Sequence, residues 1–128
     1  MPAIPNSGAM ILVVDDDAGL CMLVDRYLTM FGYRALLAAD GEAALQMARE
    51  YPEIALIMLD VVMVGISGQE LADELRRVLP DAQVLFCSGH PASALARLGV
   101  DLATAHFMQK PCRPLELKQR LSAMLVAR

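Results

Sequence analysis

Short apolar segments alternate along this chain with longer segments in which apolar residues recur at helical spacing, and few folds accommodate that pattern. The apolar segments have the length of strands and cover residues 10–14, 33–38, 54–59, 83–87 and 106–109. Helices are predicted between and after them, over residues 18–31, 41–51, 67–79, 91–98 and 114–127. Strict alternation of strands and helices favours parallel strands covered on both faces. The sequence therefore predicts a doubly wound α/β domain with a five-stranded parallel sheet.

Residues with strong preferences for helix ends support these boundaries. The predicted helices are followed by residues that stop helices, namely Gly32, Pro52, Pro80 and Gly99. Ser67 and Glu70 have the spacing of a capping box, and Pro114 suits the first turn of the last helix. The segment 91–105 fits either a short helix with a loop or a helix that frays.

Composition limits the classes of protein and partner. A chain of 128 residues, 56% of them hydrophobic, suits one domain, which we place at residues 10–128 after a flexible tail at 1–9. The net charge of −4 and the scattered basic residues argue against a nucleic-acid or membrane partner. The longest apolar stretch falls short of the roughly 20 residues of a membrane span. The three cysteines, which have no metal-like or redox-like spacing, favour a soluble cytoplasmic protein with free thiols.

Polar residues follow four of the predicted strands. Asp15 and Asp16 come after the first, Asp60 after the third, Ser88 after the fourth and Lys110 after the fifth. In doubly wound sheets, ligands bind at the carboxyl ends of the strands, where the strand order reverses. Clustered carboxylates suit Mg²⁺, and a carboxylate beside a divalent cation and an ammonium can attack a phosphorus atom. These residues therefore predict a magnesium-dependent phosphoryl-transfer site.

From about residue 10 onward, the chain resembles the receiver domain of two-component response regulators, which has a CheY-like, flavodoxin-like fold. The resemblance depends on four stretches in order, "ILVVDDD", "LIMLDVVMVGISGQEL", "VLFCSGH" and "FMQKPCRPLEL". It implies that Asp60 is the phosphoacceptor and that Mg²⁺ is bound by Asp15, Asp16, Asp60 and the backbone carbonyl of Val62. Asp17 better suits the N-terminal cap of the first helix.

The same resemblance implies roles at the last two strands. Ser88 and Lys110 would contact the phosphoryl group, and Phe107 would be the aromatic switch residue. A cis peptide bond before Pro111 would direct the Lys110 ammonium toward Asp60. Phosphorylation would then draw the Ser88 hydroxyl inward and free space for the Phe107 ring.

The partners are also implied by the family. The phosphoryl donor would be a histidine kinase or a histidine phosphotransfer protein, and the output would be a protein partner or a homodimer. The chain would not be an enzyme beyond its own Mg²⁺-dependent phosphorylation and dephosphorylation. Val64 replaces a common proline, Cys112 replaces a common phenylalanine, and "GVDLATAHF" lacks the usual Gly-Ala turn. In the segment "GVDLATAHF", and in "SGH" and "FMQKP", the chain is more similar to receivers of hybrid sensor kinases than to DNA-binding regulators.

Two alternative functions fit parts of the pattern. A phosphohydrolase with an aspartyl nucleophile would need a second aspartate two residues after Asp60, where Val62 stands. A receiver-like scaffold that works without phosphate would be favoured by loss of an acid or of the lysine, and all of them are present.

Overall fold

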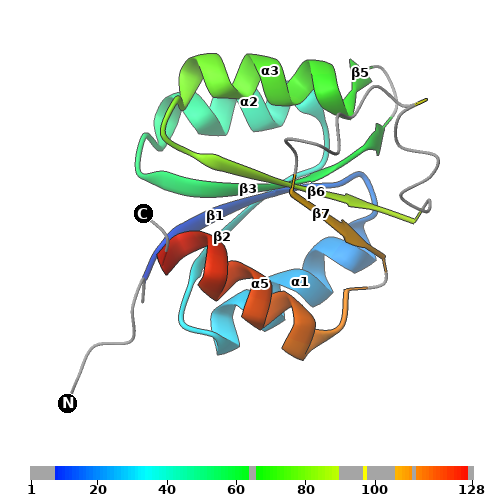
Figure 1. Cartoon of the computed structure of the whole chain (residues 1–128). Helices are drawn as coiled ribbons and strands as arrows, with labels where there is room; N and C mark the ends of the chain where they lie inside the picture. The colour runs from blue at the N-terminus through cyan, green and yellow to red at the C-terminus, as the bar shows by residue number, and fades with distance from the viewer. Residues whose placement is uncertain (1–7, 64–65, 90–96, 98–105, 111, 127–128) are drawn as a thin grey trace.

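Five parallel strands form the centre of the fold, in the order β2-β1-β3-β6-β7 (Figure 1). The computed structural model describes residues 8–63, 66–89, 97, 106–110 and 112–126. The strands of the sheet are β1 (Met10–Val14), β2 (Arg34–Ala38), β3 (Ile54–Asp60), β6 (Gln83–Ser88) and β7 (His106–Gln109). All five predicted strands are confirmed to within one residue at each end.

Helices cover both faces of the sheet, with α2 and α3 on one side and α1 and α5 on the other (Figure 1). Their bounds are α1 (Ala18–Met30), α2 (Gly41–Glu50), α3 (Gly68–Val78) and α5 (Pro114–Val126). The doubly wound α/β architecture is confirmed. Apart from Arg97, residues 91–105 lie outside the described residues, and with them the helix predicted at 91–98 and the alternatives for 91–105. The same is true of residues 1–7 of the predicted tail. No helix in the described part of the chain is long and apolar enough to cross a membrane.

Alternate side chains of each central strand enter different cores. In β3, Ile57 and Leu59 pack in the core beneath α2 and α3, whereas Leu56 and Met58 pack in the core beneath α1 and α5. Because successive side chains of a strand point to opposite faces, a strand covered on both sides must be apolar throughout. This explains the continuous apolar runs of the sequence.

Side-chain caps begin three helices. The Leu20 backbone N–H donates to Asp17 Oδ1 over 3.1 Å, and the Glu70 N–H donates to Ser67 Oγ over 3.1 Å. The predicted cap at Asp17 and the Ser67 half of the predicted capping box are therefore confirmed, and Pro114 begins α5 as expected. Asp40 caps α2 by accepting from the Ala43 N–H at 2.7 Å, a cap that the sequence analysis did not include. Each such cap contributes about 1 kcal/mol.

A small antiparallel ribbon follows β3 and was not predicted. It consists of β4 (Val62–Met63) and β5 (Ile66–Ser67), with Val62 opposite Ser67. The ribbon returns the chain to the end of β3, where the Gly68 N–H donates to the Val61 carbonyl over 3.0 Å. A Cβ atom on Gly68 would lie only 2.7 Å from the Val61 Cα. The first residue of α3 is therefore packed against the backbone that directly follows Asp60.

Replacing Gly68 with alanine is expected to lower the free energy of unfolding by about 1–2 kcal/mol, because the new methyl group overlaps backbone that cannot move independently. Urea unfolding measures the change. Gly19→Ala is the control, since its Cβ would meet only Asp17 Oδ1 at 3.5 Å and alanine favours the helix. Equal stability of the two variants would show that the close approach at Gly68 is unimportant.

Candidate functional site

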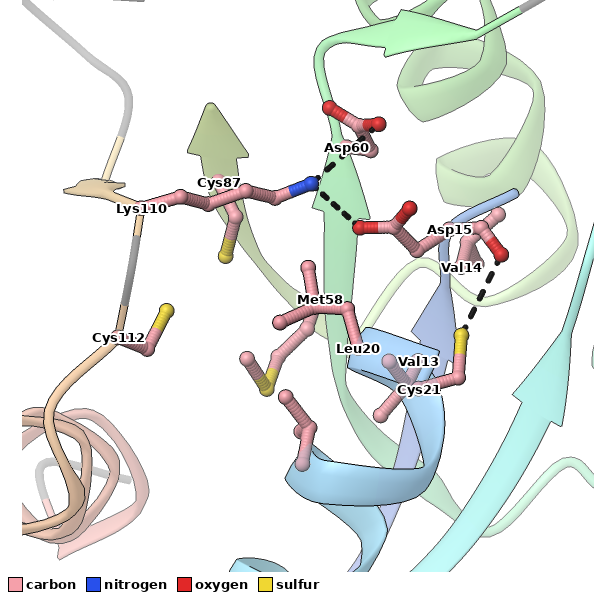
Figure 2. Close-up of a pocket in the computed structure, with 11 residues that line it drawn as sticks. Val13, Val14, Asp15, Leu20, Cys21, Met58, Asp60, Cys87, Lys110 and Cys112 are labelled. Atoms are coloured by element: carbon pink, nitrogen blue, oxygen red, sulfur yellow. Dashed lines mark hydrogen bonds and ion pairs between the residues drawn. The ribbon is translucent and has the colours of Figure 1, made fainter. Parts of the chain in front are cut away.

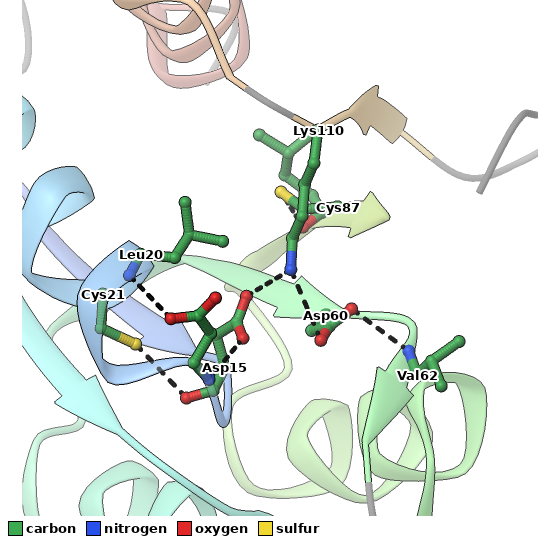
Figure 3. A network of polar contacts seen from close by, with 9 residues as sticks. Asp15, Leu20, Cys21, Asp60, Val62, Cys87 and Lys110 are labelled. Carbon is green, nitrogen blue, oxygen red and sulfur yellow. Dashed lines mark hydrogen bonds and ion pairs between the residues drawn. The ribbon is translucent and has the colours of Figure 1, made fainter. Parts of the chain in front are cut away.

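The predicted strand-end residues gather where the strand order reverses, between β1 and β3. The chain passes from β1 to β2 on one side, and β3 lies on the other side of β1. Asp15 directly follows β1, and Asp60 is the last residue of β3. Lys110 directly follows β7 and extends across the sheet edge to lie between the two carboxylates (Figure 3). The topology thus brings together side chains that are 45 to 95 residues apart in sequence.

The Lys110 ammonium contacts one oxygen of each buried carboxylate. Its Nζ lies 2.5 Å from Asp15 Oδ2 and 3.5 Å from Asp60 Oδ2. Burial lowers the pKa of Lys110, but the hydrogen bond to Asp15 and the charges of Asp60 and Asp15 outweigh it, so the pKa is raised. The Lys110 backbone N–H donates to the Ser88 carbonyl over 2.7 Å. Lys110 therefore remains a cation at neutral pH, with its backbone fixed to β6.

The second oxygen of each carboxylate is oriented by nearby backbone. Asp15 Oδ1 accepts from the Asp17 N–H at 2.9 Å, and Asp60 Oδ1 accepts from the Val62 N–H at 3.2 Å. These bonds fix the rotation of both carboxylate groups and leave their Oδ2 atoms facing Lys110 (Figure 3). The site is therefore ordered by the chain itself.

Asp15, Asp16 and Asp60 form a cluster that suits a divalent cation. Each offers a carboxylate oxygen, and these oxygens all lie within 4.8 Å of one another. Asp15 and Asp60 are buried, whereas Asp16 is exposed, so one side of the cluster faces solvent. Mg²⁺ prefers a few carboxylate ligands together with water and phosphate oxygens. The donor atoms and their spacing therefore fit Mg²⁺, and the cluster can bind a metal.

The Asp60 carboxyl has a raised pKa. Burial is the largest cause and the Asp15 charge adds to it, while Lys110 and the Val62 hydrogen bond oppose them. A raised pKa in the folded protein means that ionised Asp60 destabilises the fold. This cost is absent below the pKa of the unfolded chain and is complete once the pH exceeds the folded pKa.

In the absence of divalent cations, Asp60→Asn is therefore expected to raise the melting temperature at about pH 7, by roughly 2–5 °C. The gain should disappear below about pH 3, where Asp60 is protonated in both the folded and the unfolded state. Thermal melts across this range measure it, and the exposed Glu53→Gln variant is the control. A lower melting temperature for Asp60→Asn at neutral pH would show that the Lys110 ion pair outweighs burial.

Ser88 and Phe107 lie in the two strands where the sequence placed them, Ser88 at the end of β6 and Phe107 within β7. Ser88 is 1% exposed and ends β6, and its neighbour Cys87 pairs with Asp60 in the sheet. Phe107 is half-buried in β7 and packs against the core beneath α2 and α3, and its carbonyl accepts from Arg120 Nη1 at 3.2 Å. The phosphoryl contact of Ser88 and the switching of Phe107 stay predictions.

Three further predictions are not tested by these contacts. The carbonyl of Val62 is predicted to bind the metal, and its backbone N–H bonds to Asp60. Pro111, with its predicted cis bond, lies outside the described residues. The domain boundary at residue 10 also stays a prediction.

A pocket beneath Lys110 contains three cysteines whose location was not predicted. Cys21, Cys87 and Cys112 are free thiols, as the sequence analysis expected, and all three are buried. They line one hollow between the sheet and α1, together with apolar side chains and the functional groups of Asp15, Asp60 and Lys110 (Figure 2). The sequence held a signal for two of them, because Cys87 precedes Ser88 and Cys112 closely follows Lys110.

Comparison with known proteins gives consistent matches over nearly the whole chain. A family model described as the response regulator receiver domain matches residues 11–122. The transcriptional regulatory protein YvrH of Bacillus subtilis is 36% identical over 118 residues, which cover 91% of this chain and 49% of YvrH. The probable transcriptional regulator ycf27 of Pyropia yezoensis is 32% identical over 121 residues, covering 94% of this chain and 49% of ycf27.

Solved structures give the same result. The receiver domain of the hybrid histidine kinase CckA is 34% identical with a TM-score of 0.77, covering 91% of this chain and 98% of that one. The chemotaxis protein CheY4 of Vibrio cholerae is 26% identical with a TM-score of 0.82, and the match covers 92% of this chain and 99% of CheY4. Hybrid-kinase receivers and transcriptional regulators thus match at similar identity, so the predicted likeness to the former stays a prediction.

The matches also bear on partners. The chain spans about half the length of the curated relatives it matches. Because these relatives are transcriptional regulators, the comparisons do not support the expected absence of a nucleic-acid partner, which stays a prediction. The family model matches 11–122, well over half of the chain. This chain therefore belongs to the response regulator receiver domain family of two-component signalling.

Proposed function

We propose that the chain is a phosphorylation-controlled switch in which Asp60 accepts a phosphoryl group from a histidine kinase or a histidine phosphotransfer protein. One observation carries the proposal. The partly buried ammonium of Lys110 contacts Asp60 and Asp15 at the open end of the sheet, and these two carboxylates form with Asp16 the cluster that suits Mg²⁺. Positive charge at this position is what phosphoryl transfer to a carboxylate requires.

The transfer joins an Asp60 oxygen to phosphorus as the bond between phosphorus and the donor imidazole nitrogen breaks. The bonding electrons leave with the imidazole, and the product is an acyl phosphate. The Lys110 ammonium lies 3.5 Å from Asp60 Oδ2, close enough to move onto a phosphoryl oxygen. The Val62 N–H holds the other Asp60 oxygen and thereby aims the nucleophile.

Mg²⁺ would be held by Asp15, Asp16, Asp60 and the Val62 carbonyl, and would neutralise further charge on the phosphoryl oxygens. The Ser88 hydroxyl would bond the transferred group, because Ser88 ends the strand next to β3. Phe107, half-buried in the next strand, would change rotamer in response.

The output is a changed affinity for a protein partner or for a second copy, and the chain turns over no substrate other than its own phosphate. A cytoplasmic location is supported by the buried free thiols.

The proposal is tested by incubating the protein with Mg²⁺ and either acetyl phosphate or a phosphorylated kinase. Intact-mass analysis should show one added phosphoryl group, which hydroxylamine removes as expected for an acyl phosphate. Asp60→Asn should take up none, whereas Asp40→Asn, which keeps the α2 cap, should behave as the wild type. Stoichiometric labelling of Asp60→Asn, or no labelling of the wild type by either donor, would disprove the assignment.

A further inference from the structure

Two of the three thiols beneath Lys110 are placed to react with each other. Cys87 lies near the end of β6, where its register partner in β7 is Met108, and Cys112 follows Met108 by four residues. Both side chains belong to the core beneath α1 and α5. Figure 2 shows the Cys112 sulfur pointing toward the Cys87 sulfur across the pocket. Their sulfur atoms are therefore neighbours although the residues come from different segments.

The third thiol has a different partner. Cys21 Sγ donates to the Asp15 carbonyl over 3.3 Å, and burial together with the Asp15 charge raises its pKa. By contrast, hydrogen bonding to Cys87 lowers the pKa of Cys112 and raises that of Cys87. Cys87 and Cys112 therefore interact with each other, and Cys112, two residues after the Lys110 cation, is the better placed of the two to react first as a thiolate.

We propose that Cys87 and Cys112 form a reversible intramolecular disulfide when a small peroxide enters the pocket. The Cys112 sulfur attacks one peroxide oxygen, the O–O bond breaks, and the second oxygen leaves as water, which gives a sulfenic acid. The Cys87 sulfur then attacks the sulfenic sulfur and releases a second water. Overall, the two thiols lose two electrons and two protons, and hydrogen peroxide is reduced to two waters. A dithiol reductant reverses the reaction by exchange.

The disulfide would act on the site above it through Lys110. Cys112 follows Lys110 by two residues, and Cys87 precedes Ser88, whose carbonyl accepts from the Lys110 N–H. A covalent link would join the segments on both sides of this bond and restrict the movement of the ammonium toward a phosphoryl group. Because small misplacements of a catalytic group are costly, oxidation should slow phosphoryl uptake about tenfold or more. This effect, though not the disulfide, rests on the proposed function.

Peroxide treatment of the full chain, followed by alkylation under denaturing conditions and peptide mapping, tests the disulfide. The expected result is a linked pair of peptides containing Cys87 and Cys112, with Cys21 still alkylated, and complete reversal by dithiothreitol. Cys112→Ala should form no link, whereas Cys21→Ala, which removes a thiol from the same pocket, should link normally. Separate alkylation of Cys87 and Cys112 after peroxide treatment, or a link that includes Cys21, would overturn the proposal.

Phosphoryl uptake from acetyl phosphate by oxidised and reduced protein tests the regulation separately. Oxidised wild type should be slow, and Cys112→Ala should be unaffected by peroxide. Equal rates for linked and reduced wild type would overturn the regulatory effect while leaving the disulfide established. If reduced protein accepts no phosphate at all, the proposed function fails, and the peptide map still decides whether the disulfide forms.

Discussion

Lys110→Met is expected to lower the rate of phosphoryl transfer to Asp60 by about 10²–10³-fold, the usual loss when one charge-stabilising group is removed. Methionine keeps the unbranched apolar stem but removes the ammonium that contacts Asp15 and Asp60. The negative charge that spreads over the phosphoryl oxygens would then lose its nearest protein cation. Rapid-mixing experiments with acetyl phosphate at saturating Mg²⁺ measure the rate.

Lys118→Met is the matched control, because it removes an exposed lysine of α5, whose Nζ lies 5.9 Å from the centre of the Phe31 ring. Both variants lose one positive charge, so a general electrostatic effect on an anionic donor would appear in both. The contacts of Lys110 predict a large loss of phosphoryl-transfer rate in Lys110→Met and not in Lys118→Met. A Lys110→Met protein that accepts phosphate at the wild-type rate would show that Lys110 is only a structural counter-ion.

The architecture was predictable from the sequence because a sheet buried on both faces leaves a distinctive pattern. Alternate residues of β1 and β3 enter the two opposite cores, so both strands are written in the sequence as unbroken apolar runs, which in β3 end at Asp60. Strand-end polar residues were equally informative. Once parallel strands are inferred, Asp15, Asp60 and Lys110 must lie at one edge, whatever their separation along the chain.

Features that depend on individual side chains and short contacts were not predictable. The β4–β5 ribbon involves only two residues on each strand, too few for a periodic pattern, and it leads directly to the close approach of Gly68 to Val61. The sharing of Lys110 between two carboxylates depends on how backbone N–H groups orient them. The adjacency of Cys87 and Cys112 likewise follows from the register of β6 and β7 and not from sequence spacing.

Asp16→Asn is expected to weaken Mg²⁺ binding about tenfold or more, because it removes one of the three clustered carboxylates. Mg²⁺ that binds only the folded protein stabilises it according to the ratio of its concentration to Kd. At a concentration about 100 times the wild-type Kd, the stabilisation should fall from about 2.7 to about 1.4 kcal/mol. Thermal melts over a series of Mg²⁺ concentrations give Kd for both proteins without any phosphorylation assay.

The neighbouring residue provides a control with the same change of charge. Asp17 lies on the same loop, but its carboxylate caps α1 and is not part of the cluster. Asn caps helices as well as Asp does, so Asp17→Asn should leave both the fold and the Mg²⁺ ligands intact. A general loss of negative charge would weaken Mg²⁺ binding in both variants to the same degree, whereas direct or water-mediated ligation requires a much larger loss for Asp16→Asn. Equal shifts in Kd would therefore exclude Asp16 as a ligand and restrict the metal site to Asp15 and Asp60.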